Sequence, residues 1–275
     1  MTTDGRLQTT TRRGAAYMAV LTIVGILCMA MAVGFTLINT YDTKAKSLAV
    51  DNFGNFYTMA DNRILKFGPD GKYLYPYEEF RNGKIGMIDV TNPMKLMVYY
   101  PDFSTIVFLD RFLSPLSKYN FFDFGYQNIT AVASSVDGRV WFYDNVDFKL
   151  KKIDELGKVY RESQPLNVLI EQAPNPNFIV EKDNLIYVND PEIGIMVFDL
   201  FGSYAKTIPL KGLKRFQVLQ GQIIYQDAVT INSYNPMTFE TKGFALPDTT
   251  GMVQVAIEKA AIGILRKDKV DFYRY

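Results

Sequence analysis

Residues 47–76 read SLAVDNFGNFYTMADNRILKFGPDGKYLYP, and this stretch decides the fold. It contains four short segments rich in β-branched and aromatic residues, at 47–51, 55–59, 63–67 and 72–76. The residues between them are Gly, Asn, Asp and Pro, which tight turns prefer because they adopt positive φ, bond their own backbone or fix φ. The pattern predicts a sheet of four short strands joined by tight turns.

The same unit recurs along the chain at intervals of about 40 residues, a period typical of β-propeller blades. Its third strand is the easiest to follow, because it ends in a bulky residue just before a turn. These third strands centre on Phe67, Leu109, Ile153, Phe198, Tyr234 and Tyr273. First strands occur in matching order near Val50, Ile88, Val132, Ile179, Val218 and Ala256. The sequence therefore predicts an all-β fold, a six-bladed β-propeller.

The two ends of the repeat predict how the ring closes. The sixth unit stops after its third strand, whereas a strand pattern at residues 35–41 precedes the first unit. We expect this N-terminal strand to supply the missing outer strand of blade six, because closure removes an exposed sheet edge. A mixed α/β fold is disfavoured, since no long segment after residue 41 keeps a helical period. The best helix candidate, residues 165–172, is short and polar and is interpreted as an inter-blade loop.

The N-terminus is typical of an export signal. Residues 14–41 carry no charged side chain and follow Arg6, Arg12 and Arg13. Two interpretations remain open: a signal peptide, residues 1–32, cleaved after Ala32, or a retained anchor that associates with the membrane through residues 15–38. The strand-like alternation after Ala32 favours cleavage. Either way, the basic flank predicts that residues 33–275, the propeller, lie outside the cytoplasm, in the periplasm.

Composition excludes several classes of function. The 275 residues include no histidine and one cysteine, Cys28, which lies in the N-terminal apolar run. A Ser-His-Asp triad, a His-ligated zinc ion and thiol catalysis in the folded part are therefore excluded. The 30 basic and 29 acidic side chains almost cancel, so no general attraction to nucleic acid is expected.

One unit carries a family resemblance. Residues 50–57 (VDNFGNFY) and 64–72 (ILKFGPDGK) resemble a blade of the NHL and gluconolactonase-like (SMP-30) propellers, and the chain is similar to exported propellers of Bacteroidota. The resemblance implies a six-bladed propeller. In the gluconolactonase-like enzymes it also implies a divalent cation on the axis, held by Glu, Asn and Asp of the inner strands.

The acidic inner-strand candidates for such a cation are Asp51, Asp89, Glu181 and Glu258. Their oxygens could hold calcium without histidine. However, they stand at different places relative to their strands, and blades three and five offer none at the same place. We therefore predict no metal, no cofactor and no catalytic residue, with a calcium site as the alternative.

Each link between a second and a third strand contains an aspartate. These are Asp61, Asp102, Asp144, Asp190, Asp227 and Asp268. In a propeller such links open on one face, so the six could form an acidic binding rim with Tyr100 and Tyr143 beside it. Turn chemistry is the favoured competing explanation, because aspartate is a preferred turn residue. The basic cluster of Lys211, Lys214 and Arg215 is interpreted as solvated surface.

The resulting hypothesis is an exported, non-catalytic propeller that binds an envelope protein, as a scaffold or accessory subunit in the bacterial cell envelope. A metal-dependent hydrolase or lactonase of the gluconolactonase-like type is the first alternative. A ligand-binding sensor propeller is the second.

Overall fold

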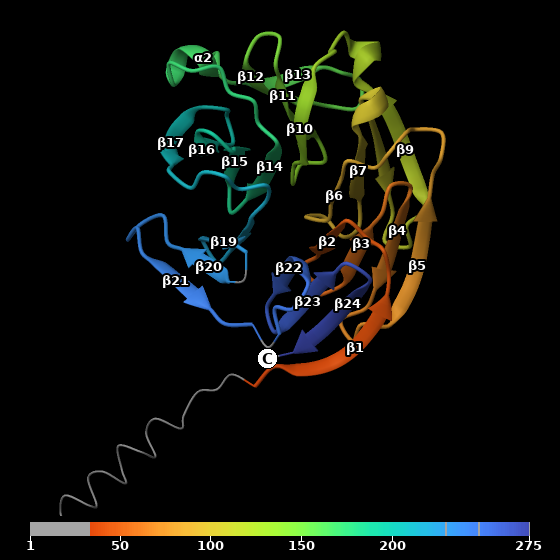
Figure 1. The fold of residues 1–275 in the computed structure, drawn as a ribbon. Helices are drawn as coiled ribbons and strands as arrows, with labels where there is room; N and C mark the ends of the chain where they lie inside the picture. The colour runs from red at the N-terminus through yellow and green to blue at the C-terminus, as the bar shows by residue number, and fades with distance from the viewer. Residues whose placement is uncertain (1–33, 229, 247, 275) are drawn as a thin grey trace, which may run out of the picture. The chain divides into compact units, whose positions relative to one another are not determined.

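The computed structural model describes residues 34–228, 230–246 and 248–274 (Figure 1). The chain divides into two compact units, Met1–Thr36 with Tyr275, and Leu37–Arg274. The predicted signal peptide or anchor at residues 1–32 lies outside the described residues, and so does Cys28. Within the part of the chain that the structure describes, no helix combines the length and the apolar character needed to cross a membrane.

The second unit consists of six four-stranded sheets, the blades, placed around a central axis (Figure 1). Blade 1 contains β2 (Ser47–Val50), β3 (Phe56–Met59), β4 (Arg63–Phe67) and β5 (Tyr73–Glu78). Blade 2 contains β6 (Met87–Asp89), β7 (Leu96–Tyr100), β8 (Thr105–Leu109) and β9 (Pro115–Asn120). Blade 3 contains β10 (Ile129–Ser134), β11 (Val140–Asp144), β12 (Lys149–Ile153) and β13 (Val159–Glu162).

The remaining three blades follow the same order. Blade 4 contains β14 (Phe178–Lys182), β15 (Leu185–Asp190), β16 (Gly194–Asp199) and β17 (Tyr204–Ile208). Blade 5 contains β18 (Gln217–Leu219), β19 (Gln222–Gln226), β20 (Ile231–Tyr234) and β21 (Thr241–Phe244). Blade 6 contains β22 (Met252–Glu258), β23 (Ala261–Arg266) and β24 (Lys269–Arg274), and its strand order is β1-β24-β23-β22, with β1 at Thr36–Asp42.

The predicted six-bladed all-β propeller is confirmed. Every predicted first and third strand is present. The features that predict a strand, alternating apolar side chains followed by turn residues, are local in the sequence, and the structure keeps the strands that they indicate. Blades 1–4 share one detail that the sequence did not predict. In each of them the pairing of the third and fourth strands shifts register near the last residue of the third strand. Such a bulge bends the outer strand and increases its twist.

Three short helical turns lie in the links. They are η1 (Pro101–Phe103), η2 (Phe121–Phe124) and α2 (Leu166–Leu169). The segment interpreted as a loop at residues 165–172 thus contains one helical turn. Pro165 precedes that turn, and Leu166, which is fully buried in the core between blades 3 and 4, anchors it by packing there and by donating its backbone N–H to the carbonyl O of Phe148 at 2.7 Å.

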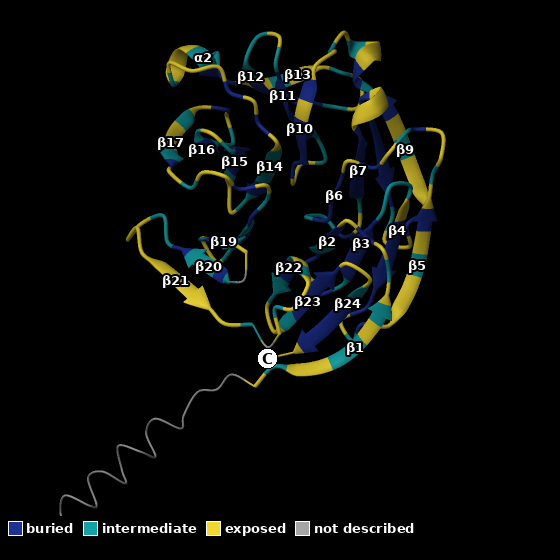
Figure 2. Cartoon of the chain, in the orientation of Figure 1, coloured by how far each residue is buried: buried dark blue, intermediate teal, exposed yellow. Residues whose placement is uncertain are grey.

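The core lies between neighbouring blades, and the middle strands are the most buried (Figure 2). Five apolar clusters join blades 1 and 2, 2 and 3, 3 and 4, 4 and 5, and 6 and 1. The third strands of blades 1–4 each carry a fully buried apolar residue at or next to their last position, and each of these residues belongs to a different cluster. They are Phe67, Leu109, Ile153 and Phe198. Among the described residues, no apolar cluster spans blades 5 and 6. Contacts other than an apolar cluster therefore hold blades 5 and 6 together.

Candidate functional site

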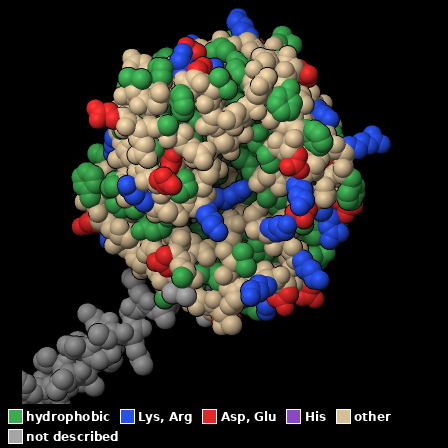
Figure 3. All heavy atoms as spheres, turned by 45° about the horizontal axis from the view of Figure 1, so that its top comes forward, with side chains coloured by type: hydrophobic (Ala, Val, Ile, Leu, Met, Phe, Trp, Pro, Cys, Tyr) green, Lys and Arg blue, Asp and Glu red, His purple; other side chains and the backbone are tan. Residues whose placement is uncertain are grey.

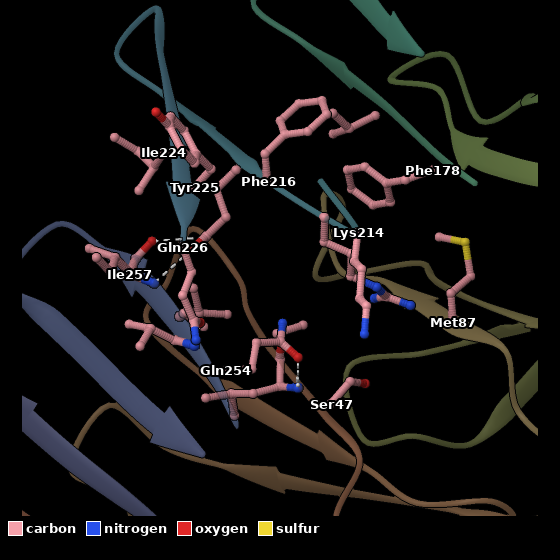
Figure 4. Close-up of a pocket in the computed structure, with 18 of the residues that line it drawn as sticks. Ser47, Met87, Phe178, Lys214, Phe216, Ile224, Tyr225, Gln226, Gln254 and Ile257 are labelled. Atoms are coloured by element: carbon pink, nitrogen blue, oxygen red, sulfur yellow. Dashed lines mark hydrogen bonds between the residues drawn. The ribbon is translucent and has the colours of Figure 1, made fainter. Parts of the chain in front are cut away.

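The inner strands enclose a channel. Its cavity has a volume of about 850 Å³ and is lined by residues of β2, β6, β14, β18 and β22 and of the links beside them (Figure 4). A volume of this size falls within the range of small-molecule sites. The channel is therefore the first candidate for a functional site, and its charged groups decide what it can do.

Asp51 directly follows β2, the inner strand of blade 1, and is buried. Its Oδ1 accepts hydrogen bonds from the backbone N–H groups of Phe53 and Asn55, both at 2.9 Å. Its Oδ2 accepts from the Asn55 side chain and from the Tyr57 hydroxyl, both at 2.8 Å. Burial, together with this carboxylate, raises the pKa of Tyr57 above its usual value. The carboxylate of Asp51 is thus saturated with donors from its own hairpin.

Asp89 and Glu181 connect neighbouring blades. Oδ2 of Asp89 accepts from the backbone N of Ser134 in blade 3 at 2.7 Å. Glu181 accepts from the indole Nε1 of Trp141 at 2.6 Å and from the backbone N of Val136 at 3.0 Å. Like Asp51, these carboxylates are engaged in structural hydrogen bonds.

Glu258, the fourth candidate, is the last residue of β22 and also lines the channel. Within the described residues, no three acidic, cysteine or histidine side chains come together as a metal-binding group. Asp51, Asp89 and Glu258 thus line the channel and Glu181 does not, and among the described residues the four do not form a metal-binding group.

Three glutamines form the polar part of the channel wall. Gln254 of β22 donates from Nε2 to the carbonyl O of Leu48 at 2.7 Å and accepts from the N–H of Leu48 at 3.0 Å. Gln217 of β18 makes the same two-way pair with Ile257 of β22. Gln226 of β19 accepts from the N–H of Val255 at 3.0 Å. Sequence reasoning missed these residues, although a lone glutamine in an apolar strand is the signal that would have found them.

Lysine and arginine side chains gather around the hollow in the middle of the face shown in Figure 3. Lys46, Lys214 and Arg215 line the channel at the end where blades are linked to one another. Lys46 forms an ion pair with Asp61. Lys214 projects into the cavity (Figure 4), and Arg215 reaches across it to blade 2, where Nη2 donates to the carbonyl O of Gly86 at 3.2 Å. The three cations that were predicted to form one solvated cluster are thus divided. Lys214 and Arg215 line the channel, whereas Lys211 does not.

Four of the six rim aspartates lie in links between second and third strands, whereas Asp144 and Asp190 are the last residues of the second strands β11 and β15. The surroundings of the six also differ. Asp102 and Asp268 are exposed, as is Asp227, while Asp61 is half-buried. The Lys46 ammonium holds the pKa of the Asp61 carboxyl below its usual range. Asp102 accepts a hydrogen bond from the backbone N of Lys84 at 2.9 Å. These four remain accessible to a partner, and the prediction of a binding rim stays a prediction for them.

The other two rim aspartates are buried. Asp144 pairs with Lys151 at 2.8 Å, and Asp190 accepts from the backbone N–H groups of Asn175 and Glu192 at 2.7 and 2.8 Å. Although burial alone would lower it, the hydrogen bonds to Asp144 and Asp147 raise the pKa of Lys151. These two aspartates fix the ends of their blades.

Tyr100 and Tyr143 are fully buried rather than placed at the rim surface. They pack in the apolar clusters between blades 1 and 2 and between blades 3 and 4. Tyr100 donates its hydroxyl to that of Tyr77 at 2.9 Å. Both tyrosines stand near the end of a middle strand, where one face of the strand points into the neighbouring blade. A partner on the rim therefore does not meet their rings.

The opposite face carries an apolar feature that the sequence analysis did not single out. Phe53, Met94 and Val136 come from the links between first and second strands of blades 1, 2 and 3, and they are 64%, 54% and 72% exposed. All three line a second cavity of about 330 Å³. Ser134 and Ser135 line the same cavity, and their buried Oγ atoms have no hydrogen-bond partner in the described chain. We call this group of five residues the hairpin-face groove.

No protein-family model matches the sequence, and neither does any curated protein. Solved structures do share the fold. A streptogramin B lyase is 12% identical with a TM-score of 0.61, and the match covers 88% of this chain and 97% of that one. A chain of the mitotic checkpoint complex is 8% identical with a TM-score of 0.61, covering 87% and 94%. BamB from Moraxella catarrhalis is 11% identical with a TM-score of 0.54, covering 88% and 98%. At these identities the likeness establishes the propeller fold alone.

Proposed function

We propose that this protein is a non-catalytic binding propeller, a scaffold or accessory subunit that holds a protein partner on the hairpin-face groove. The observation that carries the proposal is the exposure of Phe53, Met94 and Val136 around one cavity. Three consecutive blades each place an apolar side chain in water there. Clustered exposed apolar groups beside polar ones are a feature of protein interfaces.

Two further observations support binding over catalysis. Three of the four inner-strand carboxylates, Asp51, Asp89 and Glu181, accept hydrogen bonds from backbone and side-chain donors, and among the described residues no acidic cluster is arranged to hold a metal ion. A propeller of the same fold is part of the mitotic checkpoint complex, which is a protein assembly. One of the solved structures that share the fold is a lyase, so the fold alone does not decide between binding and catalysis.

We also propose that the protein is exported and acts in the cell envelope. The charge-free run at 14–41 after three arginines supports this, as does the position of β1, which begins at Thr36. Cleavage after Ala32 would leave β1 intact to close the ring as the outer strand of blade 6. In this proposal residues 1–32 are the signal and 33–275 the mature propeller. N-terminal sequencing of the protein from fractionated cells of its own host tests this: Val33 is expected as the first residue, and an intact Met1 or Thr2 in the cytoplasmic fraction would contradict it.

The partner is tested with a charged triple variant. Phe53→Asp, Met94→Asp and Val136→Asp together place three carboxylates on the hairpin-face groove. The matched control is Phe80→Asp, Phe122→Asp and Val168→Asp, which changes three exposed apolar residues in the links between blades, at the opposite ends of the strands. Tagged full-length proteins are isolated from gently solubilised envelopes, and co-purifying proteins are quantified.

A stoichiometric partner that is retained by the control and lost from the groove variant supports the proposal. Equal partner levels in both variants, or a wild-type protein that always purifies alone, would contradict it. Circular dichroism on both variants separates a lost contact from a lost fold.

A further inference from the structure

Lys214 and Arg215 lie in the link between blades 4 and 5, immediately before β18. Lys214 is exposed and its side chain projects into the channel in Figure 4, whereas Arg215 is half-buried at the channel wall. The two cations therefore share one cavity, and that cavity holds about 850 Å³.

Neither cation has an acidic partner. Within the described residues no carboxylate forms an ion pair with Lys214 or Arg215, in contrast to Lys46 at the same mouth, which pairs with Asp61. Arg215 donates one of its five N–H groups to the Gly86 carbonyl. Burial lowers the pKa of the Arg215 guanidinium, because the charged form is partly removed from water without a counter-charge. Removing a charge even partly from water without a counter-charge costs free energy. A guanidinium with N–H donors left over at a cavity wall can bind a carboxylate or phosphate through charge-assisted hydrogen bonds.

Four carboxylates also line the channel, and within the described residues none of them forms an ion pair with Lys214 or Arg215. Asp51 and Asp89 are engaged in the hydrogen bonds described above. Asp227, at the same mouth, accepts from the N–H of Thr230 and from the side chain of Asn232 at 2.9 and 3.0 Å. Lys182 and Glu258 line the channel at the ends of β14 and β22.

The wall beside the two cations is apolar. The guanidinium of Arg215 lies 5.9 Å from the ring centre of Phe178. Phe178 meets Phe216 edge to face, and the buried Met87 borders the same space (Figure 4). A ligand whose charged group reaches Arg215 would therefore place the rest of its body against aromatic and thioether surface.

We propose that the channel binds a small organic anion, with a carboxylate or phosphate group held by Arg215 and Lys214 and an apolar body packed against Phe178 and Met87. The planar guanidinium fits the paired oxygens of either group, and the lysine adds a point charge. This site lies in the channel, apart from the hairpin-face groove, so it is a second binding activity.

Titration calorimetry on the purified full-length protein tests the proposal with three probes. Phenylacetate and phenyl phosphate present a carboxylate and a phosphate on the same ring, and benzyltrimethylammonium presents a cation of similar size. The variants are Arg215→Gln, Arg215→Lys and Lys214→Gln. Lys211→Gln is the matched control, because it removes an exposed positive charge three residues before Lys214 and outside the cavity lining.

We expect at least one of the two anions to bind, and the tighter one identifies the preferred group. Arg215→Gln should weaken binding by about tenfold or more, Arg215→Lys and Lys214→Gln by less, and Lys211→Gln not at all. Added salt should weaken the binding of the anion. Binding of the cation as tight as that of the anions, an equal loss in Lys211→Gln, or no anion binding at millimolar concentration would each overturn the proposal. The triple variant of the hairpin-face groove should leave anion binding unchanged, so the two proposals can fail separately.

Discussion

The side chain of Gln217 is paired in both directions with the backbone of Ile257. Its Nε2 donates to the Ile257 carbonyl at 3.0 Å and its Oε1 accepts from the Ile257 N–H at 3.0 Å. Gln217 begins β18 in blade 5 and Ile257 lies in β22 of blade 6. The pair therefore acts as a short piece of sheet across the one junction where the described residues form no apolar cluster.

Replacing Gln217 by Ala should lower the free energy of unfolding by about 1–3 kcal/mol, because the backbone groups of Ile257 lose their partners. Hydrogen exchange at the Ile257 amide, followed by mass spectrometry or NMR, should become faster. Gln222→Ala is the control, since the Gln222 side chain makes no hydrogen bond within the described chain. If both variants were equally stable and exchanged equally, the pair would not hold the junction.

Gly263 is required by packing between blades 6 and 1. A Cβ built on Gly263 would lie 2.8 Å from the ring of Phe56 and 2.9 Å from a methyl carbon of Leu48. Both neighbours are buried, so neither can move freely. Gly263→Ala should therefore destabilise the protein by about 1–3 kcal/mol, measured by urea unfolding. Combining it with Phe56→Leu should recover part of the loss, and a simply additive loss would show that the contact is not the cause.

Asp144 and Asp268 test the two explanations of the rim aspartates. Asp144 is buried and pairs with Lys151, whereas Asp268 is exposed. Asp144→Asn should cost about 2 kcal/mol of stability, since a charged hydrogen bond is lost inside the protein. Asp268→Asn should stay within about 0.5 kcal/mol of wild type, as surface substitutions usually do. Chemical unfolding measures the stability of both variants. Similar losses of stability would show that the buried and the exposed aspartate do not differ in their structural role.

Asp137 makes stability depend on pH. Burial alone would raise its pKa, but hydrogen bonds from Lys152 and Arg139 lower the pKa of Asp137 to about 2. A carboxyl whose folded pKa lies below its unfolded value of about 3.8 stabilises the fold above that value, and the contribution is lost as pH falls toward 2. Because the side chain is 37% exposed, we expect only about 1 kcal/mol after screening by solvent.

Asp137→Asn should thus be less stable than wild type at neutral pH and equal to it near pH 2. The measurement is urea unfolding at a series of pH values. Asp123→Asn, which removes an exposed carboxylate that forms no ion pair within the described chain, should follow the wild-type curve throughout. A stability difference for Asp137→Asn that does not change with pH would rule out the ion pairs as its source.

Much of the fold was readable because its signals are local. The strand ending at Phe67 and its counterparts ending at Leu109 and Ile153 are each marked by apolar alternation and a following turn, and all are present. For the same reason four of the six aspartates lie in the expected links, while Asp144 and Asp190 end the second strands just before them. The burial of the aspartates could not be predicted from the sequence, because the exposure of Asp144 to solvent depends on Lys151 and on the neighbouring blade. Tyr100 and Tyr143 were expected at the surface for lack of that information.

The sequence by itself determined that the chain repeats a four-stranded unit six times, that histidine chemistry is absent, and that turns carry aspartate. These properties depend on residues a few positions apart. Only the tertiary structure decided that Gln217 bridges to Ile257, that Lys214 and Arg215 enter the channel without an acidic partner, and that Phe53, Met94 and Val136 surround one cavity. The first and third of these groupings join residues of different blades, and the cavity around Lys214 and Arg215 is lined by several blades, so all three exist only once the blades have been brought together around the axis.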